Sequence, residues 1–202
     1  MKFGSMTVLA TLAALTLSGC SGDASAPEPT AQTTNTEASF VADSFKVPTR
    51  IEADGFVLMP LGPDLAEIDY AAYMSSIEHL QKTFTRSTGW PRADLTMDDA
   101  MKDMETEQGR FERRESFAYA VLTPDGLRER GCVYVYPGVG EFDAVVRLWV
   151  TKAEFDAGFD EELYAWTQSW IASDWRFDNV AYPGRAIAWK DWDALTKSDE
   201  DS

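Results

Sequence analysis

The sequence predicts an α+β fold, in which a mostly antiparallel, mixed central sheet is flanked by about three helices. Short apolar segments bounded by Gly, Pro and Asp predict strands, and longer segments with apolar residues three or four positions apart predict helices. Their order along the chain is β-α-α-β-β-β-α-β-β. Because three strands follow one another with short turns between them, the centre of the sheet is expected to be antiparallel.

The first strand is expected at residues 55–61, between Asp-Gly and Gly-Pro turns. A helix is expected over 63–83, because a proline stands in its first turn and apolar residues recur at helical spacing. Thr96 is the expected N-cap of the second helix, since Asp99 follows three residues later. These elements place two helices between the first strand and the rest of the sheet.

Three strands follow in succession, expected at residues 116–123, 127–136 and 142–151. Pro-Asp-Gly and Pro-Gly-Val-Gly supply the turns between them. A third helix is expected over 160–174, where Leu and Trp recur on one face. Two short strands, at 179–182 and 186–189, are expected to end the fold before an acidic tail.

The first twenty residues predict an exported chain with a lipid anchor. The apolar run at 6–17 is shorter than the roughly 20 residues that span a bilayer, and it fits the apolar region of a secretory signal. The Leu-Ser-Gly-Cys sequence that ends at Cys20 resembles the bacterial lipoprotein signal, in which the cysteine is acylated and the chain is cut before it. The alternative is an ordinary signal peptide with a chance cysteine.

We therefore divide the chain into a signal peptide, a flexible stalk, a folded domain and an acidic tail, at residues 1–19, 20–44, 45–192 and 193–202. The stalk is rich in Ser, Ala, Thr, Pro and Glu and has no apolar period, so it is expected to stay flexible. The expected location is the cell envelope outside the cytoplasm, on the periplasmic face of the outer membrane if the source is Gram-negative. The membrane, reached through lipidated Cys20, is the expected partner.

The composition bears on other partners. The chain has 18 Lys and Arg against 34 Asp and Glu, a net charge of −16, which disfavours binding to nucleic acid.

Besides Cys20 the only cysteine is Cys132, so no intrachain disulfide is expected. Cys132 lies in a strand-like run and is interpreted as a buried, inert thiol, with an exposed reactive thiol as the alternative. One histidine and one spare cysteine cannot form a zinc or iron–sulfur site of clustered Cys and His, so no metal is expected.

The order of elements and several local motifs together resemble the GNAT (GCN5-related N-acetyltransferase) family over about residues 45–189. The motifs that carry the resemblance are Phe56-x-Leu58-x-Pro60-Leu61, Tyr70-x-x-Tyr73-Met74-x-Ser76-x-x-His79-Leu80, Gly89-Trp90-Pro91-x-x-Asp94-Leu95-Thr96, Phe117-Ala-Tyr119-x-Val121, Gly131-Cys-Val-Tyr134 and Trp175-x-Phe177-x-x-Val180-x-Tyr182-Pro183-Gly184-Arg185. The resemblance implies a GNAT-like fold and acyl transfer from acetyl-CoA, bound in a cleft between splayed central strands.

The chain departs from the family at the loop that holds the coenzyme A pyrophosphate. GNAT enzymes have Gln or Arg, two spacers, Gly, one spacer, then Gly or Ala before the third helix. The corresponding residues 151–162 contain one Gly, one Lys and five acidic residues. Acidic groups repel a pyrophosphate, and the missing glycines remove close backbone approach. The resemblance thus implies acetyl-CoA as cofactor, whereas this acidic stretch disfavours its binding. The alternative interpretation of the acidic residues is that they only complement the dipole of the following helix.

Two residues are weak catalytic candidates. His79 is the only histidine, and Ser75 and Ser76 stand about one turn before it, so a nucleophile–base pair is conceivable. The alternative is a histidine that packs on the helix surface. Tyr134 lies on a strand that lines the cleft in GNAT enzymes, where a tyrosine often serves as general acid. The alternative for Tyr134 is a core aromatic residue with a hydrogen-bonded hydroxyl.

Four residues are ligand-cleft candidates: Arg147, Trp149, Tyr136 and Trp90. Arg147 beside Trp149 is suited to clamp a carboxylate or to stack on an aromatic ligand, although strand arginines usually face solvent. Trp90 stands in a Gly-Trp-Pro loop and is interpreted as a lid or cleft residue. Most of the other tryptophans are expected in the core.

Two functions stay open at this point. The first is a GNAT-like acyltransferase domain on a membrane-anchored lipoprotein, with a substrate that the sequence does not name. The second is a catalytically silent GNAT-fold lipoprotein that binds a small ligand or an envelope protein partner. Because acetyl-CoA is a cytoplasmic metabolite, the expected location and the departure at 151–162 favour the second.

Overall fold

A computed structural model describes residues 40–200. These residues belong to one compact unit that extends over residues 36–202. Cys20, the expected signal peptide and most of the expected stalk lie outside the described residues. Among the described helices, none has the length and apolar character needed to cross a membrane.

One six-stranded sheet forms the centre of this unit, with its strands in chain order from β1 to β6. The strands are β1 (Ile51–Ala53), β2 (Phe56–Pro60), β3 (Phe117–Leu122), β4 (Glu129–Pro137), β5 (Ala144–Val150) and β6 (Val180–Ala181). Neighbouring strands are antiparallel except β5 and β6, which are parallel. The expected α+β fold with a mostly antiparallel, mixed sheet is therefore confirmed, and the parallel pair is joined through a helical crossover, as parallel strands require.

The helical elements are η1 (Pro63–Leu65), α1 (Ala66–Met74), α2 (Ile77–Leu80), η2 (Gln81–Thr85), α3 (Met97–Glu112), α4 (Lys152–Asp156), α5 (Phe159–Asp174) and α6 (Trp189–Glu200). The single helix expected over 63–83 is interrupted after α1. The hydroxyl of Ser75 donates to the carbonyl of Ala72 at 2.6 Å, and the N–H of Ser76 donates to the carbonyl of Tyr73 at 3.0 Å. Serines that bond to nearby backbone groups in this way compete with helix continuation.

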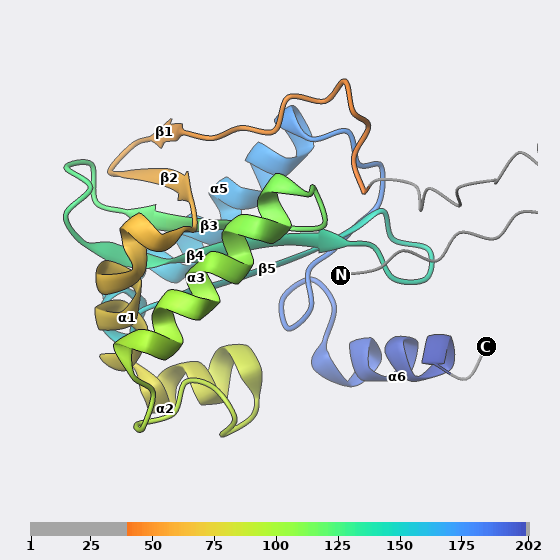
Figure 1. Ribbon diagram of the computed structural model, residues 1–202. Coiled ribbons are helices and arrows are strands. Elements are labelled where there is room, and N and C mark those ends of the chain that lie inside the picture. The colour runs from red at the N-terminus through yellow and green to blue at the C-terminus, as the bar shows by residue number, and fades with distance from the viewer. Residues whose placement is uncertain (1–39, 201–202) are drawn as a thin grey trace, which may run out of the picture. The chain divides into compact units, whose positions relative to one another are not determined.

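The helices cover both faces of the sheet. Figure 1 shows α1 and α3 in front of the strands and α5 behind them. Side chains alternate along β5, so Val146 and Leu148 pack in the cluster on the α5 side, whereas Trp149 packs in the cluster with α1 and α3. This alternation places Arg147 and Trp149 on the same face.

Two boundaries differ from those expected from the sequence. The strand expected at 186–189 is absent from the described part of the chain, where Ile187 forms only an isolated bridge with Pro183. In its place α6 begins at Trp189 and takes in most of the expected acidic tail. At the other end, Val41 is 7% exposed and Phe40 stacks on Phe177, so packing begins before residue 45.

The start of α3 is capped as expected. The Thr96 hydroxyl accepts from the N–H of Asp99, and the Asp99 carboxylate accepts from the N–H of Thr96 at 3.0 Å. This reciprocal capping box satisfies two backbone donors that would otherwise have no partner within the helix.

Replacement of the cap, Thr96→Ala, is expected to lower the free energy of unfolding by about 1 kcal/mol, because an N–H at the start of α3 loses its partner. Urea denaturation of the full-length protein measures the change. Thr106→Ala in the same helix is the matched control, since the Thr106 hydroxyl donates only to the Lys102 carbonyl one turn earlier. Equal losses in both variants would contradict the role of the cap.

Candidate functional site

The candidate site is a pocket beside the open edge of β5. Parallel pairing with β6 extends only over Ala144 and Val145, and the two strands then part. Residues 146–150 of β5 line a pocket of about 250 Å³, together with residues from α2, η2 and the segment 183–189. An unpaired strand edge presents backbone N–H and C=O groups, so the pocket offers hydrogen-bond partners to a ligand.

Arg147 enters this pocket from β5. Its guanidinium donates a hydrogen bond to the carbonyl of Phe84 in η2 and lies 4.3 Å from the centre of the Phe84 ring. The Trp189 ring lies 5.5 Å from the same guanidinium. Burial lowers the pKa of Arg147 from its usual value, because a low-dielectric surrounding disfavours the charged form. The Arg147 guanidinium thus lies within reach of two aromatic rings.

Aromatic residues fill the space behind Arg147. The indole N–H of Trp149 donates to the hydroxyl of Tyr134 at 3.2 Å, and the rings of Tyr134 and Tyr136 are stacked 5.7 Å apart. Trp90 lies 6.3 Å from Trp149 between ring centres and also packs on Tyr73. Of these residues, Trp149 lines the pocket, whereas Tyr134, Tyr136 and Trp90 lie beyond the described lining.

The charges around the pocket are mostly positive. Lys82, Arg147 and Arg185 line it, and Asp160 is the carboxylate among the lining residues. Arg185 forms two hydrogen bonds with Asp160, each 2.8 Å long, so that carboxylate is already paired. Within residues 40–200 no ion pair joins Lys82 to a carboxylate. The pocket is therefore cationic although the whole chain is acidic.

His79 lies at the edge of the same pocket. Its ring centre is 4.9 Å from that of Phe155, and burial followed by the charge of Lys152 lowers its pKa. In the described part of the chain, no hydrogen bond joins its ring to Ser75 or Ser76. The Ser76 hydroxyl instead accepts from the N–H of Lys152 at 2.8 Å. His79 therefore packs on Phe155 without a contact to these serines, as in the alternative of a packing histidine.

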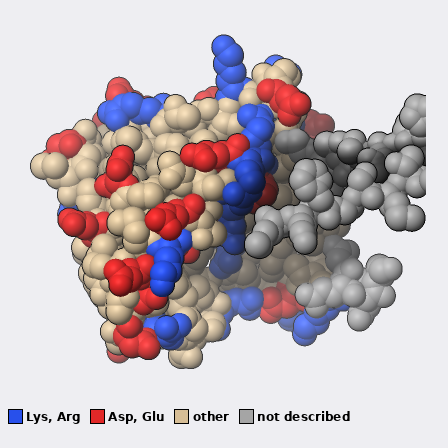
Figure 2. Space-filling view, in the orientation of Figure 1, with Lys and Arg blue, Asp and Glu red and all other residues tan. Residues whose placement is uncertain are grey.

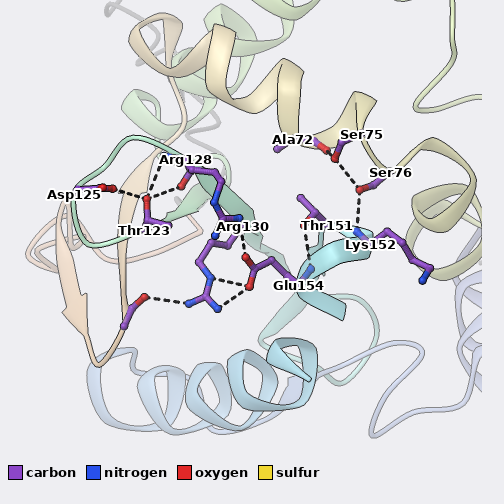
Figure 3. A network of polar contacts seen from close by, with 11 residues as sticks. Ala72, Ser75, Ser76, Thr123, Asp125, Arg128, Arg130, Thr151, Lys152 and Glu154 are labelled. Carbon is purple, nitrogen blue, oxygen red and sulfur yellow. Dashed lines mark hydrogen bonds and ion pairs between the residues drawn. The ribbon is translucent and has the colours of Figure 1, made fainter. Parts of the chain in front are cut away.

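The acidic stretch at 151–162 is largely neutralised. The Glu154 carboxylate receives hydrogen bonds from Arg128 at 2.7 Å and from Arg130 at 2.9 and 2.7 Å, as Figure 3 shows. Burial alone would raise the pKa of Glu154, but these hydrogen bonds outweigh it and hold the pKa below its usual value. Asp156 is paired with Lys152. With Asp160 on Arg185, three of the five acids have a cationic partner, so repulsion of an anion is weaker than the sequence indicated.

The backbone of this stretch is also occupied. Where the resemblance places a pyrophosphate loop, the chain forms the short helix α4. The N–H of Lys152 donates to Ser76, and the N–H of Glu154 donates to the Thr151 hydroxyl at 3.3 Å. Backbone donors that would cradle a phosphate are therefore bonded to the chain's own hydroxyl groups.

The start of α6 forms one wall of the pocket. Trp189 lines the pocket, and the guanidinium of Arg86 lies 4.0 Å from the centre of its ring. Arg86 also forms hydrogen bonds of 3.0 and 2.8 Å with Asp193 of α6. Gly184 has a φ of +76°, and a Cβ there would collide with the indole of Trp189. A glycine is thus required for this wall to pack closely.

Surface charge elsewhere is mixed. Figure 2 shows acidic and basic side chains interspersed over much of the face that carries α1 and α3, and a continuous stripe of basic side chains at its edge.

Arg147 and Trp149 were cleft candidates and His79 a separate catalytic candidate, and all three line this pocket. Several other lining residues were not singled out from the sequence. Those residues are Lys82, Phe84, Phe155, Arg185 and Trp189. They come from segments that are far apart in the chain. Of these residues, only Arg185 could have been found from the sequence, because it stands in a Pro-Gly-Arg break and belongs to the motif at 175–185.

Comparison with known proteins gives similarities of low identity. No protein-family model matches the chain, and no curated protein matches it. Among solved structures, a putative ribosomal-protein-serine acetyltransferase from Vibrio cholerae aligns with a TM-score of 0.48 at 15% identity, over 60% of this chain and 65% of that chain. The ribosomal-protein-S5-alanine acetyltransferase from Vibrio fischeri aligns with a TM-score of 0.49 at 12% identity, over 61% of this chain and 67% of that chain. A putative GNAT-family acetyltransferase from Bordetella pertussis aligns with a TM-score of 0.45 at 22% identity, over 64% of this chain and 75% of that chain. The chain thus spans just under two thirds of the first of these.

Removal of the buried carboxylate, Glu154→Gln, is expected to lower the free energy of unfolding by about 1–3 kcal/mol, because Arg130 loses its charged partner. Asp156→Asn is the matched control, since its pair with Lys152 is exposed and contributes little. Because the pKa of Glu154 is lowered in the folded state, its contribution is present above its usual value of about 4.5 and is lost as the pH falls through the folded value.

Urea denaturation at pH 7 and at lower pH measures both effects. The difference between the wild type and Glu154→Gln should shrink as the pH falls below about 4.5. A pH-independent difference would contradict the assignment of the charged pair.

Proposed function

We propose that the chain is a GNAT-like, lipid-anchored envelope protein that binds a small anionic ligand with a flat or aromatic body in the pocket beside β5. We further propose that it does not hold acetyl-CoA in the usual GNAT manner. The observation that carries the proposal is the cationic lining of this pocket in a chain with a net charge of −16.

The cations support an anionic group on the ligand. Arg147 and Lys82 face the pocket without a carboxylate partner in the described part of the chain, and Arg185 shares one with Asp160. A guanidinium presents several N–H donors in a plane and binds carboxylate or phosphate with two of them. In surroundings of low dielectric such a charge-assisted hydrogen bond is stronger than it is in water.

The rings support a flat body on the ligand. Phe84, Trp149, Phe155 and Trp189 all line the pocket. Aromatic side chains favour stacked or edge-on contact with another planar group, and they exclude water from the neighbouring charges. A volume of about 250 Å³ suits a ligand smaller than a nucleotide cofactor.

Two features count against the usual cofactor. The backbone N–H groups of Lys152 and Glu154 are bonded to Ser76 and Thr151, within the short helix α4. The loop has a single glycine, Gly158, at a φ of +85°. A pyrophosphate would therefore have to break internal hydrogen bonds in order to reach the donors that it uses in GNAT enzymes.

Acyl transfer is the second candidate, and Tyr134 favours it. Burial raises the pKa of the Tyr134 hydroxyl well above its usual value, so the hydroxyl keeps its proton at neutral pH. It lies beside Trp149, which lines the pocket. The position of this hydroxyl beside a ligand pocket is that of a general acid, although its raised pKa makes it a weaker proton donor than a tyrosine in water.

Calorimetry on the full-length protein separates the two candidates. Phenyl phosphate and benzoate are the anionic probes, and benzyl alcohol is the uncharged control. Arg147→Gln is expected to weaken the binding of the better anion about tenfold or more, because it removes a charge-assisted hydrogen bond. Arg92→Gln, at an exposed pair with Asp94, should leave the dissociation constant unchanged.

Acetyl-CoA and coenzyme A form the second arm of this experiment. Saturable binding of acetyl-CoA at micromolar concentrations would overturn the proposal and favour acyl transfer. Equal binding of benzyl alcohol and the anions would also contradict it. Circular dichroism of Arg147→Gln confirms that the variant is folded before its affinity is read.

The lipid anchor is tested separately. Cys20→Ser is expected to move the protein from the membrane fraction to the soluble fraction, because stable anchoring needs the acyl chains on this thiol. Fractionation of cells followed by immunoblotting measures the shift, and Cys132→Ser is the matched control that should stay with the membrane. A Cys20→Ser protein that remains membrane-bound would sink the assignment.

A further inference from the structure

Three side chains that can ligate a metal meet beneath α1. Asp69 comes from α1, and Glu129 and Cys132 come from β4. One ligand atom of each lies within 4.8 Å of the others. The three residues are 3%, 2% and 0% exposed, so the cluster belongs to the interior. Acidic side chains are rarely buried this deeply unless they are paired or ligate a metal.

The contacts inside the cluster leave lone pairs unused. The Cys132 thiol lies 2.9 Å from Oε1 of Glu129 and 3.8 Å from Oδ1 of Asp69. The second oxygen of Glu129, Oε2, is fully buried and has no hydrogen-bond partner within the described part of the chain. A buried carboxylate oxygen without a partner costs free energy that a bound cation would recover.

The surroundings of the cluster are acidic. Besides the cluster itself, Asp103 and Glu107 on α3 lie close enough to Asp69 to act on its charge. A bound divalent cation would offset the charge of these acidic groups.

We propose that Asp69, Glu129 and Cys132 bind one divalent transition-metal ion, with Zn²⁺ as the ion that suits one thiolate and two carboxylates. Zn²⁺ accepts sulfur at about 2.3 Å and carboxylate oxygen at about 2.0–2.2 Å, usually with four ligands. Binding releases the thiol proton and any carboxyl proton to solvent, and no redox change is involved. The ion would tie α1 to the centre of β4.

Access to the cluster is from the side of Glu129. Glu129 also lines a surface pocket of about 500 Å³, together with Ala72 and Thr151. An ion would reach the cluster from this pocket, past the Glu129 side chain. The proposed metal site shares no lining residue with the anion pocket, so it goes beyond the function proposed above.

Cobalt titration tests the site, because Co²⁺ substitutes for Zn²⁺ and its thiolate bond absorbs in the near ultraviolet. The experiment uses the full-length chain with Cys20→Ser, so that Cys132 is the only thiol, after treatment with a chelator. We expect a charge-transfer band that saturates at one cobalt per chain. Added Zn²⁺ should displace it.

Variants separate a metal site from a buried acid cluster that holds only protons. Cys132→Ser should remove the charge-transfer band, and Glu129→Gln should weaken cobalt binding at least tenfold. Glu112→Gln, at an exposed position on α3, is the matched control and should bind as the parent does. Cys132→Ser removes the absorbing thiolate even if the ion still binds, so a second measurement is needed. Zn²⁺ should raise the melting temperature of the parent but not that of Glu129→Gln.

The proposal is overturned if the parent shows no saturable band, if the band survives Cys132→Ser, or if Zn²⁺ raises the melting temperatures of the parent and Glu129→Gln equally. Circular dichroism establishes that each variant is folded. Failure of this test leaves the calorimetric result on the anion pocket unaffected, because the two sites use different residues.

Discussion

The early separation of β5 from β6 is the constraint on which the rest of the site depends. Parallel pairing stops after Val145, so the following residues of β5 have no partner strand on that side. Because side chains alternate along a strand, Arg147 and Trp149 then project from one face. The residues that close the resulting space come from η2 and from the start of α6, which supply Phe84 and Trp189. Strand geometry, more than any single motif, creates the pocket.

Several acidic side chains of this protein are neutralised by ion pairs with arginines. Glu154 is buried with Arg128 and Arg130, and Arg130 also lies 3.3 Å from the centre of the Phe159 ring. In such pairs the negative charge of the carboxylate is offset by its cationic partner. The neighbouring pocket therefore experiences mainly the positive charges of its own lining residues. Net charge is therefore a poor guide to the charge of a site, because a site responds to nearby groups within about a Debye length, roughly 8–10 Å.

Local patterns predicted what depends on local physics. The Thr96 capping box and the strands β2 to β6 follow from spacing and turn residues, and the structure confirms them, whereas β1 was not predicted and the strand expected at 186–189 does not form. The break at Ser75 depends on one hydroxyl that donates to the carbonyl of Ala72 one turn earlier, which periodicity does not detect. The meeting of Asp69 with Glu129 and Cys132 depends on the packing of α1 against β4. No sequence pattern joins residues that are so far apart, so neither this cluster nor the full lining of the pocket could be predicted.

The contact between Arg86 and Asp193 joins residues 107 positions apart and attaches α6 to the end of η2. Both side chains are about 40% exposed, so dissolved ions screen their attraction. The stacking of Arg86 on Trp189 is less sensitive to screening, because it also buries ring surface. One wall of the pocket is thus held by an interaction that weakens as ionic strength rises, while the β5 wall is held by the sheet. The salinity of the surroundings therefore sets how firmly the pocket is closed on that side.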